Sequence, residues 1–423
     1  IYRGVPADGL RIGNTRHGER SFFNENWPNR TRHWLPTVDH PYDKATNEFI
    51  ITAPSHYQVI SNGLLVEESI INANQKLTHW KQSVPISSWL YVLGVARFAV
   101  QYVDEFMGKQ IQTWVYPQDR DKGFFDFVSP TKEVLGFYSN YVGPFAYEKL
   151  ANIQSPSVGG GMETASAIFY GENLVNGKRD VRLRNVVIHE IAHQWFGNAV
   201  TESTWDDAWL SEGFATYFTM LFQEYAYGTS VYVDELKKAR TRIFNFYNKD
   251  STYKIIDNRT AEEGPVTNDM TYQKGAWVLH MLREKMGHEV FKEGIRAYYQ
   301  KFYNKNVTTD DFFAEMQKFT KAPLSTFRNQ WLHHPEVLNL QVAWRYDSAS
   351  SQVEITIDQK QSTGFYFEAP VEIEIVESTD KKIISLDISG RTSTFKIKAD
   401  KKPVAILADP RTTLLAKFEI RVL

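Results

Sequence analysis

The chain has 423 residues, too many for one hydrophobic core, so we expect roughly two to four domains. Its 48 basic and 50 acidic residues give a formal charge of −2, which disfavours nucleic acid as a partner, and no apolar run approaches the roughly 18 residues of a membrane span. Cysteine is absent from the sequence, which excludes disulfides and thiolate chemistry and leaves His, Asp and Glu as ligands for any transition metal.

The N-terminus carries little information about targeting. The first residue is Ile1 rather than Met, and no charged segment followed by an apolar one comes after it, so we expect a processed or cropped product. The sequence carries no signal for a compartment, and an extracytoplasmic location, periplasmic or secreted, is our expectation. We assume a monomer.

The first hundred residues contain short β-rich runs separated by turn residues. These runs are residues 48–52, 57–60 and 89–95, and the second is followed by the turn pair Asn62-Gly63. Long helical periodicity is missing from this part of the sequence. We therefore predict an N-terminal antiparallel β domain over residues 1–102.

The middle of the chain has helical patterns instead. A helix is predicted for each of six segments: residues 131–141, 181–197, 212–227, 275–286, 290–302 and 309–319. The threonines and aspartates at 308–311 offer Thr or Asp capping candidates at the start of the last of these helices. The pattern predicts a mainly helical domain over residues 103–335.

The last part of the chain returns to strands. Apolar and polar residues alternate over residues 353–357, 371–375, 383–388 and 395–397, as in strands that have one face in solvent. We predict a small β-sandwich over residues 336–423. The expected fold class is therefore a multidomain α+β protein, with an N-terminal β domain, a mainly helical middle domain and a C-terminal β-sandwich.

A metal-binding pattern lies within the second predicted helix. His189 and His193 are four residues apart, so both imidazoles point from one face of a helix and can bind one ion, while Glu190 lies beside them. The alternative is a helix with two unrelated histidines. A chance match to His-Glu-x-x-His is expected only about 0.02 times in a chain of this length and composition.

Glu212 supplies the third ligand in this interpretation. It follows His193 by nineteen residues and begins the next predicted helix, so an antiparallel return brings its carboxylate back to the imidazoles. Two histidines and a glutamate are the ligands of a catalytic zinc site, whose fourth position holds water. We expect one Zn²⁺ per chain, with Glu190 as the base that takes the proton of the zinc-bound water. Taken alone, Glu212 is better explained by stabilisation of a helix N-terminus, and its spacing from His189 and His193 is what favours the ligand role.

Ligating imidazoles usually donate their second N–H to a carboxylate or a carbonyl. Asp206 and Asp207 are the nearest candidates for this contact in the sequence. A solvated acidic turn is the alternative explanation for the two residues.

The residues around this pattern resemble a known family. Residues 187–201, which contain the His-Glu-x-x-His pattern, and Trp-Leu-Ser-Glu-Gly-Phe-Ala at 209–215 closely resemble the zinc aminopeptidases of the aminopeptidase N and leukotriene hydrolase family, which are gluzincins. Gly-Gly-Met-Glu-Thr at 160–164 is similar to its exopeptidase motif, and Tyr-Gln-Lys-Gly at 272–275 to a second motif. Residues 32–41 are similar to the signature of its N-terminal domain.

The resemblance extends over nearly the whole chain and implies a fold. It implies a thermolysin-like catalytic domain between two β domains. By position, the N-terminal domain corresponds to the second half of the family's saddle domain, and we expect a short form without the C-terminal helical domain of many relatives.

The resemblance also implies a substrate and further site residues. Peptides with a free N-terminal amine would be the substrates, and Glu163 would bind the α-amine, which places the first peptide bond over the metal. Gly160, Gly161 and Met162 would line the substrate backbone, and a plain flexible loop is the alternative for the glycines. Tyr272 would donate a hydrogen bond to the oxyanion, as the family's tyrosine does.

Two departures and two other functions stay open at this point. Thr164 replaces the family's usual Asn, and Glu25 to Trp27 stands near the place of a second amine contact that we cannot assign. The expected function is a zinc-dependent aminopeptidase. The alternatives are a catalytically silent scaffold of the same family and an epoxide hydrolase that uses the same zinc.

Overall fold

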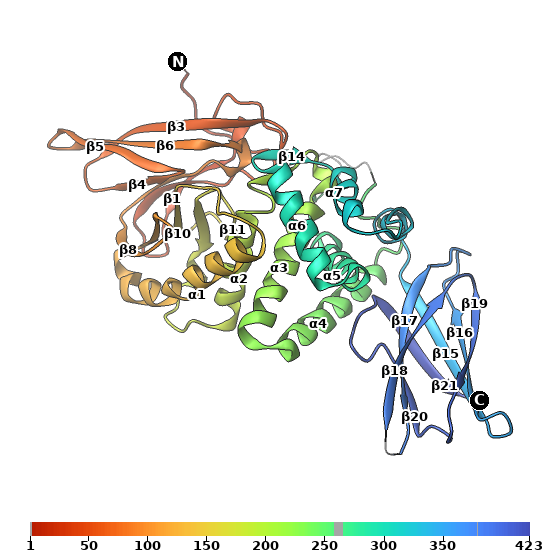
Figure 1. The fold of residues 1–423 in the computed structure, drawn as a ribbon. Coiled ribbons are helices and arrows are strands. Elements are labelled where there is room, and N and C mark those ends of the chain that lie inside the picture. Colours follow the sequence, from red (N-terminus) through yellow and green to blue (C-terminus); the bar gives the residue numbers. More distant parts are fainter. Residues whose placement is uncertain (1, 258–264, 379) are drawn as a thin grey trace.

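The computed structural model of the protein describes residues 2–257, 265–378 and 380–423. Figure 1 shows three parts in chain order: an N-terminal β domain, a central domain with most of the helices, and a C-terminal β-sandwich that extends away from the other two. The expected multidomain α+β architecture is confirmed.

The N-terminal β domain consists of two antiparallel sheets, as predicted. One has the strand order β1-β2-β7-β4 and the other β3-β6-β5. Large apolar side chains such as Phe23, Trp80 and Trp89 are buried in it. The strands are β1 (Leu10–Asn14), β2 (Arg20–Asn24), β3 (Lys44–Pro54), β4 (Gln58–Ser61), β5 (Leu64–Asn72), β6 (Gln75–Ser87) and β7 (Leu93–Ala96).

The central domain begins with a five-stranded sheet of order β11-β12-β10-β9-β8, which the helical patterns did not predict. β10 (Lys149–Ser155) runs parallel to β9 (Lys109–Val115) and β12 (Ala167–Gly171), whereas the edge strands β8 (Ala99–Phe106) and β11 (Gly161–Met162) are antiparallel to their neighbours. The boundary expected after residue 102 therefore cuts a strand. Because β8 pairs with β9, the boundary belongs before Ala99.

The helices of the central domain cover this sheet and form the core beside it (Figure 1). They are α1 (Arg120–Tyr141), α2 (Val181–His193), α3 (Trp209–Tyr227), α4 (Thr229–Tyr247), α5 (Gly275–Met286), α6 (His288–Phe302), α7 (Thr309–Met316) and α8 (Ser325–Arg328). All six predicted helices are found, although α2 ends four residues before the predicted Gly197 and 3₁₀ geometry replaces the end of the last one. Thr308 caps α7 as expected, in a reciprocal pair with Asp311.

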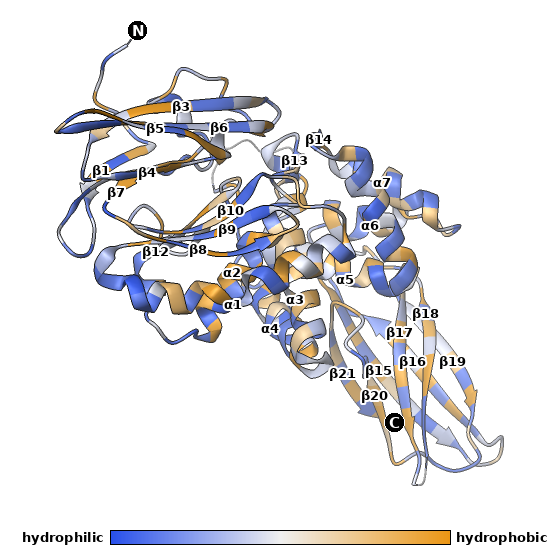
Figure 2. Ribbon diagram, turned by 60° about the vertical axis from the view of Figure 1, so that its left-hand side comes forward, coloured by the Kyte–Doolittle hydropathy of each residue, from blue (hydrophilic) through white to orange (hydrophobic). Residues whose placement is uncertain are grey.

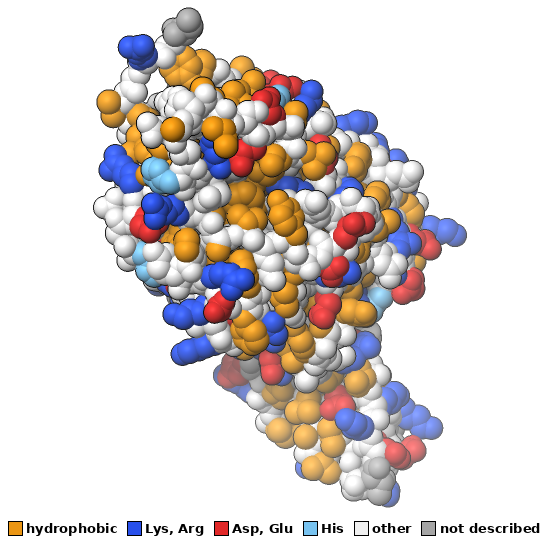
Figure 3. Space-filling model, turned by 90° about the vertical axis from the view of Figure 1, so that its left-hand side faces the viewer, with side chains coloured by type: hydrophobic (Ala, Val, Ile, Leu, Met, Phe, Trp, Pro, Cys, Tyr) orange, Lys and Arg blue, Asp and Glu red, His pale blue; other side chains and the backbone are white. Residues whose placement is uncertain are grey.

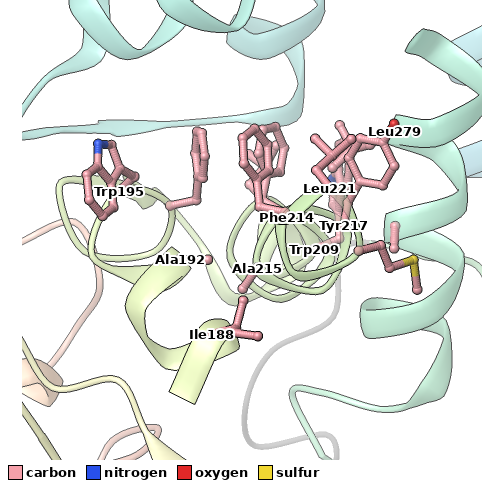
Figure 4. Packing of buried hydrophobic residues seen from close by; sticks show 14 of the residues in the cluster. Ile188, Ala192, Trp195, Trp209, Phe214, Ala215, Tyr217, Leu221 and Leu279 are labelled. Carbon is pink, nitrogen blue, oxygen red and sulfur yellow. The ribbon is translucent and has the colours of Figure 1, made fainter. Parts of the chain in front are cut away.

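Tight packing of α2 against α3 fixes the centre of the domain. In Figure 4, Ile188 and Ala192 of α2 lie beside Ala215 of α3, and aromatic rings including Trp195 and Phe214 form a row above them in this view. The small alanines let the two helix backbones approach closely, so α3 returns antiparallel along α2. This return brings Ser211, at the start of α3, to His193 at the end of α2.

The C-terminal domain is a sandwich of a four-stranded sheet, β19-β16-β15-β21, and a three-stranded sheet, β18-β17-β20. Figure 2 shows hydrophilic and hydrophobic residues alternating along its strands, the pattern from which these strands were predicted. The strands are β15 (Leu338–Asp347), β16 (Gln352–Gln359), β17 (Ala369–Val376), β18 (Lys381–Ile388), β19 (Thr392–Lys398), β20 (Ala405–Ala408) and β21 (Ala416–Val422). The boundary expected after residue 335 falls between the last helical turn, Asn329–His333, and β15.

The surface mixes charges of both signs. On the face shown in Figure 3, acidic and basic side chains are interspersed with hydrophobic ones. Among the described residues, no helix has both the length and the apolar character that crossing a membrane requires.

Candidate active site

The two histidines of the predicted metal site lie one turn apart near the end of α2. Asp180 begins this helix by accepting a hydrogen bond from the backbone N–H of Leu183 at 2.9 Å. The Nε2 atoms of His189 and His193 are 3.0 Å apart, so both rings point to one place. The helix therefore presents the two imidazoles as the spacing predicted.

Glu212 joins them from the first turn of α3. Its Oε2 lies 3.3 Å from Nε2 of His189 and 3.2 Å from Nε2 of His193. Burial would raise the pKa of Glu212, but the two imidazoles outweigh burial and lower it to about 2. Burial likewise favours neutral His193, yet Glu163 and Glu212 raise its pKa to about 10. These opposed shifts are those of an ion pair, in which His193 stabilises the charged form of Glu212, and Glu163 and Glu212 stabilise the charged form of His193.

Two further glutamates, Glu163 and Glu190, lie beside this triad. One ligand atom from each of Glu163, Glu190 and His193 falls within 4.8 Å of the others. Burial, with the neighbouring Glu163 carboxylate, raises the pKa of Glu190 well above its usual value. Burial is also the main cause that raises the pKa of Glu163 to about 7, with Glu212 adding to it. Glu163 thus titrates near neutral pH, and both carboxyls hold a proton more readily than an ordinary glutamate does.

Of the glycines before Glu163, only Gly161 is required by close packing. A Cβ on Gly161 would lie 2.1 Å from Oε1 of Glu190, whereas a Cβ on Gly160 would meet nothing within 4 Å. Met162 is buried and pairs with Phe169 of β12. Edge strand β11 therefore brings the chain directly against Glu190 and leads into Glu163.

Tyr272 reaches the triad from a turn of π-helix, Met270–Lys274, that precedes α5. Its hydroxyl donates to Oε1 of Glu212 at 2.6 Å, and its ring stacks on His189 with centroids 5.9 Å apart. Burial and the Glu212 carboxylate raise the pKa of Tyr272 well above its usual value, so this hydroxyl keeps its proton. The structure thus brings all the predicted polar site residues together.

The expected aspartate partners of the histidines are not found. Nδ1 of His193 lies 3.1 Å from the carbonyl oxygen of Phe196 and 3.1 Å from Oγ of Ser211. Asp207 instead accepts from the N–H and hydroxyl of Thr309, at the start of α7, and Asp206 accepts from the N–H of Asp257. The main-chain carbonyl of Phe196, three residues after the end of α2, takes the place expected for an acidic side chain of the loop.

The side chains of Glu25 and Asn26, near the place of the second amine contact, are engaged by other groups. Glu25 is bound by two arginines, by Arg11 at 3.3 Å and by Arg30 in a close ion pair. The side chain of Asn26 is tied to main-chain carbonyls of Ser88 and Tyr91. Thr164, the other departure, donates to the carbonyl of Ala167 at 2.5 Å, which fixes the turn after Glu163.

Two amides that the sequence analysis did not single out hold the main chain of Glu163. The Nε2 of Gln194 and the Nδ2 of Asn198 both donate to its carbonyl oxygen, at 3.0 and 2.6 Å. Both belong to the turn that follows α2, and both are fully buried. The sequence does not mark these two residues as functional, because amide side chains are not expected as metal ligands or general bases.

Comparison with known families accounts for this arrangement. The peptidase family M1 domain matches residues 128–331, and the peptidase M1 N-terminal domain matches residues 15–90. The chain belongs to peptidase family M1. The family model contains every residue of the site described above.

Relatives of this M1 chain are aminopeptidases by name. It is 29% identical over 318 residues to mouse glutamyl aminopeptidase, covering 72% of this chain and 33% of the relative. A probable aminopeptidase 2 of Sulfurisphaera tokodaii is 27% identical, over 89% of this chain and 48% of the relative. The chain thus spans a third to about half of the length of these relatives.

A solved structure supports the fold. The crystal structure of Legionella pneumophila aminopeptidase A in complex with aspartic acid matches 98% of this chain and 49% of that chain, with a TM-score of 0.82 and 20% identity. All three parts of this M1 chain, including the C-terminal sandwich, thus have counterparts in one known architecture.

Proposed function

We propose that this M1 chain is a zinc-dependent aminopeptidase that removes the first residue from peptides with a free N-terminal amine. The observation that carries the proposal is the convergence of His189, His193 and Glu212 on one point, with the carboxylates of Glu163 and Glu190 beside it. The names of the relatives support the same activity.

The donor set fits one zinc ion per chain. Two imidazole nitrogens and one carboxylate oxygen are ligands that zinc takes in catalytic sites, and all three are buried or half-buried on two helices that pack together. The carbonyl of Phe196 fixes the tautomer of His193, so that Nε2 is free to ligate. When bound, zinc supplies a Lewis acid and lowers the pKa of water to about 7.

Glu190 is the proposed general base. It is placed next to the ligands without being one of the triad, and its Oε2 is buried without a hydrogen-bond partner among the described residues. An unpartnered buried carboxylate oxygen is a good acceptor for the proton of an attacking water. The proton can then pass from Glu190 to the leaving amine of the peptide.

Glu163 is the proposed anchor for the substrate amine. Burial raises the pKa of its carboxyl, because the charged form is poorly solvated there. An ammonium that enters the site stabilises the charged form and gains a partner for its own charge. Because Glu163 lies at a fixed place next to Glu190 and His193, only the first peptide bond reaches the base. This geometry makes the peptidase an exopeptidase.

Tyr272 is the proposed donor to the oxyanion. Its hydroxyl is protonated and lies at the triad, where it now bonds Glu212. A small rotation exchanges this acceptor for a substrate oxygen that gains negative charge during the reaction. Such a preorganised donor stabilises the transition state more than the ground state.

The test is cleavage of matched substrates by the zinc-loaded protein. An aminoacyl p-nitroanilide with a free amine should be hydrolysed, and its N-acetylated form should be cleaved poorly or not at all. Equal cleavage of the two would contradict the role of Glu163 and indicate an endopeptidase. Stoichiometric zinc without any turnover, over a panel of first residues, would instead support a catalytically silent scaffold.

A further inference from the structure

A buried lysine of the N-terminal β domain reaches into the turn that follows α2. Lys44, the first residue of β3, extends its ammonium to the carbonyl oxygens of Asn198 and Ala199, each at 3.0 Å. These carbonyls follow the zinc-binding pattern directly. A cation from another domain therefore binds the main chain just behind the proposed metal ligands.

The turn that Lys44 binds is the one that holds Glu163. Asn198 presents its main-chain oxygen to Lys44 and its side-chain Nδ2 to the carbonyl of Glu163, at 2.6 Å. A third contact, from the hydroxyl of Thr201 to the Asn198 carbonyl at 2.8 Å, closes the turn. The path from Lys44 to Glu163 thus consists of one residue, which is fully buried.

A buried carboxylate, that of Glu202, lies near Lys44 and interacts with its charge. Both oxygens of its buried carboxylate lack a hydrogen-bond partner among the residues that the structure describes. Burial lowers the pKa of Lys44 to about 7, and the attraction of Glu202 opposes that shift. Burial also raises the pKa of Glu202 to about 8, with Glu163 and Glu212 adding to it. Glu202 is thus the carboxylate whose charge favours the ammonium form of Lys44.

A second contact ties the same two segments. The Nδ2 of Asn306 donates to the carbonyl of Pro41, just before β3, and to that of Glu202 in β13 (Val200–Glu202), at 2.8 and 3.2 Å. The N-terminal β domain is thereby fixed to both ends of the segment 198–202. Movement of that domain would be transmitted to Asn198.

We propose that Lys44 is a positioning residue that sets the place of Glu163, through Asn198, and so controls how tightly the site binds the substrate ammonium. The inference rests on the proposed function, in which Glu163 binds that amine. Lys44 does not touch the substrate. Its effect is confined to ligands that carry an α-ammonium.

A pair of hydroxamates separates this role from general damage. Alanine hydroxamate and propionohydroxamate carry the same zinc-binding group and differ only in the α-ammonium. Their dissociation constants are measured by calorimetry on zinc-loaded protein, for wild type and for Lys44→Met. The variant should bind alanine hydroxamate about tenfold more weakly and propionohydroxamate within about twofold of wild type.

Arg16→Met is the matched control. Arg16 also reaches from the N-terminal β domain to the central domain, where it donates to the carbonyls of Glu172 and Val175 and to the carboxylate of Asp119. None of these three acceptors belongs to the 198–202 turn. The Arg16→Met variant should have a lower melting temperature than wild type, but the ratio of the two dissociation constants should be unchanged. Lys44→Gln, which keeps an N–H donor on a shorter side chain, should give an intermediate ratio and serves if Lys44→Met does not fold.

The outcomes distinguish this inference from the proposed function. An unchanged ratio in Lys44→Met and Lys44→Gln, with zinc bound, would overturn the role of Lys44. Equal weakening of the binding of both hydroxamates would also overturn it, because the effect would then lie at the metal and not at the ammonium. If wild type itself binds the two hydroxamates equally, the amine-binding role of Glu163 fails instead.

Discussion

Gly213 of α3 and Gly275 of α5 face each other so closely that a Cβ added to either would lie 2.9 Å from the Cα of the other. Each follows a functional residue of the proposed site, Gly213 directly after Glu212 and Gly275 three residues after Tyr272. The contact brings the π-helical turn against the first turn of α3. The hydrogen bond from Tyr272 to Glu212 joins the same two segments.

We therefore expect Gly275→Ala to damage both stability and activity. The added methyl meets backbone atoms, which cannot rotate away, and overpacking of this kind costs about 1–3 kcal/mol. It also pushes Tyr272 away from Glu212, so kcat should fall. Chemical denaturation and steady-state kinetics measure the two effects.

Gly136→Ala in α1 is the matched control for that substitution. A Cβ there would meet only a ring carbon of Phe106, at 3.9 Å, which is ordinary contact. Alanine in a helix interior is about 0.5–1 kcal/mol more favourable than glycine, so this variant should be stabilised slightly and remain active. Gly275→Ala behaving like Gly136→Ala would show that the helix contact is not needed.

The sequence was sufficient to predict that His189, His193 and Glu212 meet, because their spacing is local. His189 and His193 share a helix face by periodicity alone, and the antiparallel return needed for Glu212 is what two packed helices produce. The alternating strands of the C-terminal sandwich were predictable for the same reason. Each of these features depends on residues close together in the chain.

Other parts of the site depend on contacts that no local pattern encodes. The π-helical turn carrying Tyr272 has no periodicity of its own, and the partner of His193 is a main-chain carbonyl, which every residue offers. The first half of α1 was missed because its helical geometry breaks at Ser129 and Pro130. Lys44 lies more than 150 positions from the carbonyls that it binds.

Zinc content should separate the two glutamates of the site. Glu212→Ala removes a ligand and should lose metal, whereas Glu190→Gln should keep it, because an amide of nearly the same shape leaves the triad intact. Glu190→Gln should nevertheless lower kcat by about 10²–10⁴-fold, since an amide does not accept the proton. Metal analysis after gel filtration, together with kinetics, tests both. Equal zinc content in the two variants would show that the roles are assigned wrongly.

Chelation gives an independent test of the metal. Dialysis against a chelator should abolish peptidase activity, and one equivalent of Zn²⁺ should restore it, because the described residues offer one complete His, His, Glu triad. Full activity of metal-free protein would contradict the mechanism.

Tyr272→Phe removes a single hydroxyl from the site. Zinc content and melting temperature should stay near those of wild type, and kcat should fall about 100- to 1,000-fold with little change in KM, because the lost hydrogen bond acts in the transition state. A kcat close to that of wild type would dismiss Tyr272 as the oxyanion donor.

A buried histidine at the sandwich interface should make stability depend on pH. His280 of α5 bonds the Thr412 carbonyl through Nε2 and the Tyr232 hydroxyl through Nδ1, both at 2.8 Å. Burial lowers its pKa from 6.5 to about 4, so between these values the unfolded chain binds a proton that the folded chain does not. This contribution to stability is present above pH 6.5 and is lost as the pH falls towards 4.

The size of the effect follows from proton linkage. One proton taken up on unfolding changes the free energy of unfolding by at most about 1.4 kcal/mol per pH unit. Urea titrations between pH 7 and 5 should therefore give a steeper loss of stability for wild type than for His280→Gln. Parallel pH profiles of the two proteins would rule out His280 as the titrating group.

The last prediction concerns the selectivity for a free amine. Glu163→Ala should lower kcat/KM for free-amine substrates by a factor that corresponds to about 2–5 kcal/mol, because the substrate ammonium loses its partner in a buried site. The same variant should change the slow cleavage of N-acetylated substrates little, so the gap between the two substrate types narrows. Glu163→Asp keeps the charge but withdraws it by one methylene, and should reduce kcat while zinc content and melting temperature stay unchanged. An undiminished preference for free amines in Glu163→Ala would place the amine-binding group elsewhere in the site.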